Sequence, residues 1–242
     1  MKKKLNIKNL CMFLLLVLFL VAFIISGIKI IVYLKDNYNN KKIQEGTNKK
    51  IQEGIKYNID FKFLKKQNPD AIAYLKVNGT NINYVVVRGN DNSYYLKHNF
   101  NKEWNVSGWI FADFHNKFDE TDNNIVIFGH NTRDGSMFGT LKNVLTEDWR
   151  KNKDNLKIIL VTEKDTYYYQ VFSTYEIKPE DYYIRTQFNN IDEFKDLIDT
   201  IIKRSNYNYD IKVAPSDKIL TLSSCTSGGK KRVVLHEKLI IE

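Results

Sequence analysis

Residues 218–241 read KILTLSSCTSGGKKRVVLHEKLII. Two runs rich in apolar and β-branched residues, Lys218–Leu222 and Arg232–Ile241, flank a Ser-Gly-Gly turn, which is the pattern of two antiparallel strands. Cys225 closes the first run and Arg232 opens the second. Pairing of the two strands would bring both residues to one end of a sheet. Strand ends on a rigid scaffold commonly present reactive groups, so this stretch predicts both a β fold and a site.

Most of the remaining body also carries strand patterns. Ile82–Val86 follows an Asn-Gly turn dipeptide and alternates in side-chain character, and Ile125–Phe128 is a compact apolar run that stops at a glycine. Leu156–Val161 and Tyr167–Tyr175 flank a short charged turn. These two runs predict a second hairpin.

Three segments favour helices. Asp60–Lys66 has its apolar residues on one side, and Asn68-Pro69-Asp70 before Ala-Ile-Ala-Tyr is typical of a helix start. Asp192–Lys203 has apolar residues at helical spacing. Strands dominate and do not alternate with helices. We therefore expect a mostly β fold, a closed barrel or sandwich with helical insertions.

The charge of the chain is uneven. The 242 residues hold 37 Lys plus Arg and 28 Asp plus Glu, a formal net charge of +9. Eleven Lys and three acidic residues fall in residues 1–56, which leaves 26 basic and 25 acidic groups in residues 57–242. Because the body is nearly neutral, no nucleic-acid partner is predicted. Two cysteines, Cys11 in the N-terminal apolar run and Cys225 in the body, predict neither a disulfide framework nor a metal site.

The N-terminus has the pattern of a membrane anchor. A Lys-rich tail over residues 1–9 precedes an apolar segment over residues 10–34, whose first 19 residues carry no charge. As a helix those 19 residues span about 28 Å, close to the hydrocarbon thickness of a bilayer. The positive-inside rule then places the N-terminus in the cytoplasm and the body outside, in a single-pass cell-membrane protein. A cleaved signal peptide is the alternative, and it exports the body equally.

Residues 35–56 are polar and contain a tandem repeat. Lys-Lys-Ile-Gln-Glu-Gly occurs at residues 41–46 and again at residues 49–54. Two copies are too few for a solenoid, so we interpret the segment as a spacer between the anchor and a folded body over residues 57–242.

Three short segments combine reactive residue types with strand ends. Ile127–Asn131 places His130 after an apolar strand and a glycine, Thr221–Thr226 ends near Cys225, and Arg232–His236 opens with Arg232. Taken alone, Cys225 suits a small buried residue, His130 a surface residue and Arg232 a strand-edge charge. Their joint occurrence favours catalysis.

These motifs resemble those of sortases. The segments at residues 68–75, 79–84 and 91–96, and the helix expected near residues 192–203, are similar to class B members over roughly residues 57–242. One departure is Glu237-Lys238, where many class B members have Gly-Arg. The resemblance implies a closed sortase-type β-barrel with N-terminal helices and one helix in the loop before the Cys strand.

The resemblance also implies a function. It predicts an extracellular cysteine transpeptidase of a thick-walled, Gram-positive bacterium, with no cofactor. Such an enzyme cleaves a secreted protein after Thr in an Asn-Pro-x-Thr-like sorting signal, through a thioester, and joins it to an amine of peptidoglycan or of a lipid-linked precursor. Cys225 would be the nucleophile, His130 the acid/base and Arg232 the oxyanion stabiliser. Predicted substrate contacts are Ser223, Asn92, Leu96, Tyr182, Tyr183 and Ile184.

Three alternatives remain open from the sequence. A different exported cysteine peptidase or acyltransferase would share the nucleophile, and a sortase of another class, such as a pilus polymerase, would share the motifs. An anchored binding module with a buried Cys225 would need no chemistry at all. Transfer to an added amine separates the enzymes, and thiol labelling separates the binding module.

Overall fold

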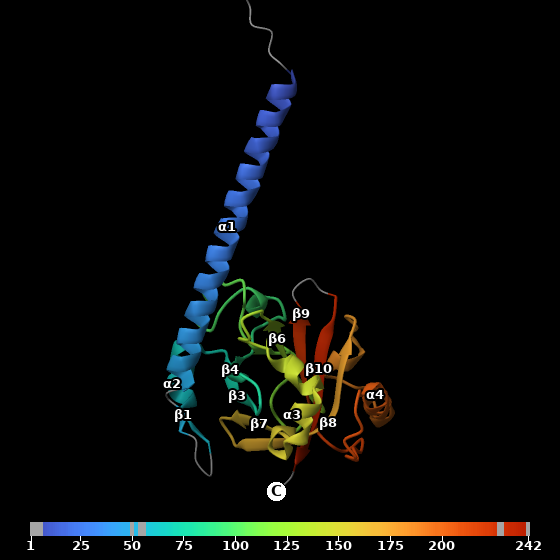
Figure 1. Cartoon of the computed structure of the whole chain (residues 1–242). Coiled ribbons are helices and arrows are strands. Elements are labelled where there is room, and N and C mark those ends of the chain that lie inside the picture. Colours follow the sequence, from blue (N-terminus) through green and yellow to red (C-terminus); the bar gives the residue numbers. More distant parts are fainter. Residues whose placement is uncertain (1–6, 49–50, 53–56, 227–229, 241–242) are drawn as a thin grey trace, which may run out of the picture.

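A computed structural model of the chain describes residues 7–48, 51–52, 57–226 and 230–240. One long helix, α1 (Ile7–Asn48), leads into a body built around a β-barrel (Figure 1). Its N-terminal half is apolar and long enough to cross a membrane. A signal sequence near an N-terminus can have the same length and apolar composition, so this helix is a candidate membrane span.

Eight strands form a closed barrel in the order β10-β8-β7-β3-β4-β5-β6-β9. Neighbours are antiparallel except β4 with β5 and β6 with β9. A mostly β, closed-barrel fold is thereby confirmed. The barrel strands are β3 (Ala71–Val77), β4 (Asn83–Val87), β5 (Phe111–Ala112), β6 (Asn124–Asn131), β7 (Lys157–Thr162), β8 (Thr166–Ile177), β9 (Ile219–Thr226) and β10 (Arg232–Ile240).

Short helices and one small sheet complete the body. The sheet pairs β1 (Ile51–Gln52) with β2 (Asn58–Ile59). The helices are α2 (Phe61–Gln67), α3 (Glu147–Lys151), α4 (Ile191–Arg204) and the 3₁₀ turns η1 (Tyr94–Leu96), η2 (Leu141–Leu145), η3 (Lys153–Leu156) and η4 (Tyr182–Ile184). Helices α2 and α4 confirm the helices expected over residues 60–66 and 192–203. Asp60 caps α2 by accepting from the amide of Phe63, and Asn190 caps α4 by accepting from Glu193.

One expected helix is wrong. Residues 71–77, after Asn68-Pro69-Asp70, form the central strand β3. This strand pairs with β4 on one side and β7 on the other, and both of its faces are largely buried. A strand buried on both faces loses the alternation that identifies strands in a sequence, and pairing on both edges overrides a local helix-start signal.

Two hydrophobic clusters position the site. The larger cluster fills the barrel and contains Trp109, Phe138 and Leu235. The smaller one packs Phe194 and Ile201 of α4 against β8, β9 and β10. Helix α4 therefore covers the outer face of the strands that carry the C-terminal motifs, and holds η4 beside them.

Residues 35–48 of the expected spacer continue α1 as helix. This part of α1 lies alongside β4 and the segment before β5, at the left of the body (Figure 1). The first copy of the repeat therefore lies in α1. Most of the second copy lies outside the described residues, which include only Ile51 and Gln52 from it.

Candidate active site

The three predicted catalytic residues come from three neighbouring strands. In the parallel pair of β6 and β9, His130 lies in register with Cys225. The antiparallel ladder of β9 and β10 ends with Val234 opposite Ser223, and two more residues along each strand lead to Cys225 and Arg232. The backbone thus brings all three to one end of the barrel, and the C-terminal hairpin predicted this for Cys225 and Arg232. The Cys225 side chain is outside the described part.

Close packing places His130 at this end. A Cβ on the preceding Gly129 would lie 2.6 Å from the ring of Phe138, which is buried in the barrel. Only glycine lets β6 run this close to Phe138 without displacing it. The Gly-His order seen in the sequence therefore has a packing reason.

A backbone carbonyl orients the imidazole. Nε2 of His130 lies 2.8 Å from the carbonyl oxygen of Leu96, at the end of η1. Since a carbonyl can only accept, Nε2 carries a proton in this arrangement. Nδ1 makes no hydrogen bond to any described residue. Leu96 was predicted as a substrate contact, and its carbonyl role is an addition that side-chain patterns do not reveal.

A buried polar chain lies behind this end of the barrel. His236 of β10 is fully buried, and burial lowers its pKa from 6.5 to about 3, so it is neutral. Its Nε2 pairs with the Tyr175 hydroxyl at 2.8 Å and its Nδ1 with the Thr221 hydroxyl at 2.9 Å. Thr221 donates to Asn124 Oδ1 at 2.8 Å. The Tyr175 hydroxyl also lies 2.7 Å from that of Tyr182, and burial raises the pKa of Tyr175. His236 therefore joins β6, β8, β9 and η4 structurally.

Two predicted substrate contacts face each other inside the protein. Ser223 is 1% exposed, and its hydroxyl lies 3.0 Å from that of buried Tyr183. This contact fixes η4 to β9 two residues before Cys225. A direct contact of either side chain with substrate stays a prediction.

Two other predicted contacts line one hollow. Asn92 and Ile184, far apart in the sequence, both border an open hollow of about 380 Å³. The Asn92 amide donates to Asp113 at 2.7 Å and accepts from the amide of Phe114, so its side chain is held in place. Tyr182 lies beside this hollow in η4 and is half-buried. The fold therefore brings Asn92 and Ile184 to one hollow, and their contact with substrate stays a prediction.

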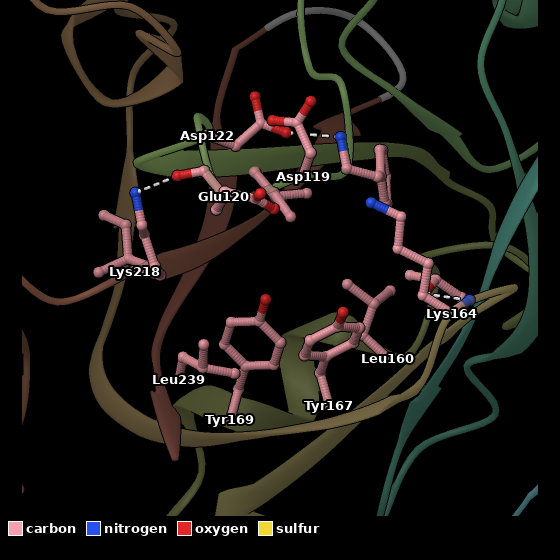
Figure 2. Close-up of a pocket in the computed structure, with 13 residues that line it drawn as sticks. Asp119, Glu120, Asp122, Leu160, Lys164, Tyr167, Tyr169, Lys218 and Leu239 are labelled. Atoms are coloured by element: carbon pink, nitrogen blue, oxygen red, sulfur yellow. Dashed lines mark hydrogen bonds between the residues drawn. The ribbon is translucent and has the colours of Figure 1, made fainter. Parts of the chain in front are cut away.

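A separate cavity of about 200 Å³ opens at the other end of the barrel (Figure 2). It is lined where β9 begins and β10 ends, with Tyr167 and Tyr169 on one side and Asp119, Glu120 and Asp122 on another. None of the predicted catalytic residues borders it. Among the described residues, no group of three or more His, Cys, Asp or Glu is placed to hold a metal ion.

Comparison with known proteins identifies the family. A family model described as the sortase domain matches residues 75–240. Over 233 aligned residues, the chain is 34% identical to sortase B of Staphylococcus aureus (strain NCTC 8325 / PS 47), in an alignment that covers 93% of this chain and 94% of that protein. This chain belongs to the sortase family.

Solved sortase structures share the fold. Sortase B from Bacillus anthracis in complex with AAEK1 superimposes with a TM-score of 0.76 and 32% identity, covering 86% of this chain and 100% of that one. A sortase B complexed with triglycine gives a TM-score of 0.73 and 32% identity, covering 85% and 97%. The sortase described here is therefore a class B cysteine transpeptidase that attaches proteins to the cell wall.

Proposed function

We propose that this sortase cleaves a secreted protein after Thr in an Asn-Pro-x-Thr-like C-terminal sorting signal and transfers it to an amine. Cys225 is the nucleophile, His130 the general acid and base, and Arg232 the oxyanion stabiliser. The observation that carries the proposal is the parallel register of His130 with Cys225, with the imidazole held by the Leu96 carbonyl. The pairing gives a nucleophile and a proton carrier on adjacent, rigid strands.

The first half-reaction forms a thioester. The Cys225 thiolate attacks the carbonyl carbon of the Thr peptide bond, and the carbonyl oxygen becomes an oxyanion. When this intermediate collapses, the C–N bond breaks and His130 gives its Nδ1 proton to the departing amine. The Leu96 carbonyl holds the ring in place for this step by accepting from Nε2–H, while Nδ1 gives its proton.

The second half-reaction regenerates the enzyme. The acceptor amine attacks the thioester, His130 takes its proton, and the Cys225 thiolate leaves. The guanidinium of Arg232 offers only N–H donors, so its role is to donate hydrogen bonds to the oxyanion. Its place at the start of β10, half-buried and two residues beyond the last pair of the β9–β10 ladder, supports that role.

The orientation of the body favours an acceptor near the membrane. The C-terminus, at the end of β10, lies at the lower end of the body, whereas the apolar half of α1 rises beyond the upper end (Figure 1). β9 ends and β10 begins at that upper end. With residues 10–34 in the bilayer and the N-terminus in the cytoplasm, the site faces the outer membrane surface. A peptidoglycan precursor amine still linked to lipid is the acceptor best placed to reach it.

The substrate residues complete the proposal. Asn92 and Ile184 border the hollow beside η4, Tyr182 flanks it, and the Leu96 side chain is half-buried next to the His130 contact. An extended peptide lying between residues 91–96 and η4 would place its scissile bond at the His130 and Cys225 strand ends. Ser223 and Tyr183 support the peptide site from behind, because their hydrogen-bonded hydroxyls hold η4 against β9.

A peptide-library assay tests the function. The full chain in detergent is incubated with peptides that carry varied four-residue signals, with and without triglycine as the amine, and products are identified by mass. We expect cleavage after Thr and, with triglycine, a ligated product; Cys225→Ala abolishes both. Full activity of Cys225→Ala would refute the proposed nucleophile, and hydrolysis without any ligation would refute transfer.

A further inference from the structure

The body-facing side of α1 is mostly polar, and Ile43 is the partly buried apolar residue of this segment that packs against the barrel core. Asp36, Asn37, Asn40 and Thr47 are buried, and Asn40 is only 1% exposed. Their spacing, continued by Gln44 and Asn48, follows one face of a helix. Buried polar side chains destabilise an interface unless they are hydrogen-bonded, so such a stripe indicates specific contacts and not a loose spacer. We call residues 36–48 the docking half of α1.

The docking half binds the turn before β5. The Asn40 and Asn105 amides pair reciprocally at 3.1 and 3.0 Å, and Asn40 also donates to the carbonyl of Gly108 at 3.3 Å. Asp36 Oδ2 accepts from the Val106 amide at 2.9 Å. Asn37 accepts from the hydroxyl of Ser107 at 2.5 Å. The turn at residues 105–108 is therefore bonded to α1 along its whole length.

The same turn holds the residues on either side of Leu96. The backbone N–H of Asn105 donates to the carbonyl of Lys97 at 2.7 Å, and the backbone N–H of Trp109 donates to the carbonyl of Tyr95 at 2.9 Å. Gly108 has φ of +56°, and a Cβ there would lie 2.3 Å from the Tyr95 carbonyl oxygen. Leu96 thus lies between two carbonyls that are both fixed by residues 105–109.

The carbonyl between these two anchors is the one that orients His130. We propose that the docking half of α1 is a positioning element for catalysis: through Asn40 and Asn105 it sets the place of the Leu96 carbonyl, and so the orientation of the His130 imidazole. The inference rests on the proposed role of His130. It makes Asn40 and Asn105 positioning residues, which contact neither substrate nor the reacting atoms.

Other contacts keep the turn folded without α1. The Trp109 indole donates to the carbonyl of Val85 at 2.8 Å, and the Tyr95 hydroxyl donates to Asp70 at 2.6 Å. Loss of the α1 contacts therefore shifts the Leu96 carbonyl without removing it. A misplacement on the order of 1 Å at a catalytic group can cost up to about 100-fold in rate, so a partial shift should cost about tenfold.

The test uses the full chain in detergent with a cleaved sorting peptide and triglycine. Asn40→Ala, Asn105→Ala and the double variant are compared with Gln44→Ala. Gln44 is the matched control, because it lies on the same face of α1 and donates to a backbone carbonyl, that of Asn83 at 3.1 Å, but on β4 and not on the 105–109 turn. Measurements are kcat, KM and the melting temperature of each variant.

We expect Asn40→Ala and Asn105→Ala each to lower kcat about tenfold with KM changed less than about twofold. The loss in the double variant should be smaller than the product of the two single losses, because both single variants already lose the shared Asn40–Asn105 pair. Asn40→Ala also loses the bond to Gly108, and Asn105→Ala also loses the bonds to Asp36 and Ser107. Gln44→Ala should keep kcat within about twofold of the wild type, even if its melting temperature falls by as much as that of Asn40→Ala. Normal kcat in Asn40→Ala, or equal losses in Asn40→Ala and Gln44→Ala, would overturn the inference. Absence of activity in the wild type would instead count against the proposed function.

Discussion

Glu237 of β10 is a buried carboxyl with no hydrogen-bond partner on either oxygen among the described residues. It is 0% exposed and lies opposite Val171 and Leu220. Burial raises its pKa well above the ordinary 4.5, because desolvation disfavours the charged carboxylate. We predict that Glu237→Gln stabilises the sortase at neutral pH, because the amide resembles the neutral acid and cannot ionise in the unfolded chain.

The sign and size follow from proton linkage. Above pH 4.5 the unfolded chain releases the Glu237 proton while the folded protein retains it, so this group's stabilisation is complete below pH 4.5 and is lost as pH rises toward the folded-state pKa. The loss is up to about 1.4 kcal/mol for each pH unit. His236, with its pKa lowered to about 3, acts oppositely: stability falls as pH drops from 6.5 to 3, because the unfolded chain binds a proton that the buried imidazole does not.

These two groups give the wild type and the variant different profiles. In the wild type the two effects oppose each other between pH 4.5 and 6.5, over the part of that range that lies below the folded-state pKa of Glu237. In Glu237→Gln stability rises up to pH 6.5 and then levels. Urea unfolding followed by tryptophan fluorescence, at about pH 4, 6 and 8, measures the difference. We expect the two proteins to have equal free energies of unfolding at the lowest pH. At the two higher pH values, the free energy of unfolding of Glu237→Gln should exceed that of the wild type by a growing amount. A difference that stays constant across pH would refute a raised pKa of Glu237.

Three further predictions concern the site. Arg232→Lys should lose most of kcat with an intact fold, because a point charge does not replace the planar guanidinium fork; a near-normal rate would remove Arg232 from the catalytic set. Tyr175→Phe should lower the free energy of unfolding by about 1–3 kcal/mol, since it leaves His236 Nε2 and the Tyr182 hydroxyl without their shared partner; denaturant melts that match the wild type would contradict this. Gly129→Ala should lower both the melting temperature and kcat, because its Cβ would lie 2.6 Å from the Phe138 ring beside His130; an unchanged kcat would show that β6 tolerates the shift.

The strands that carry the site were predictable because their signals are local. β6, the β7–β8 hairpin, and β9 with β10 follow from apolar runs punctuated by glycine or charged turns. The central strand β3 was missed for the opposite reason: its identity comes from partners on both edges, β4 and β7, which no local pattern contains. Barrel closure by the parallel β6–β9 pair is likewise a long-range property.

The sequence indicates the residue types of the candidate site but not the contacts that support them. Cys225, His130 and Arg232 stand out because three reactive residue types fall at strand ends together, and their catalytic roles stay a prediction. The Leu96 carbonyl leaves no trace in the sequence, because every residue has one. The Tyr183–Ser223 contact pairs residues that each suited a substrate role when taken separately. Side-chain chemistry indicates which groups react, whereas the contacts that orient them depend on how distant segments meet.

The docking half of α1 shows why a polar stretch is easily misread. Asparagine and glutamine between an anchor and a domain suit a solvated spacer, and their composition alone supports nothing more. Their helical spacing changes the interpretation, since side chains at Asp36, Asn40 and Gln44 face the body together. Because α1 is one continuous helix, inserting a single residue before Asp36 would turn this face by about 100° relative to the apolar half. Because the candidate span and the docking half belong to one helix, a rotation of the apolar half about the helix axis also turns the face that contacts the body.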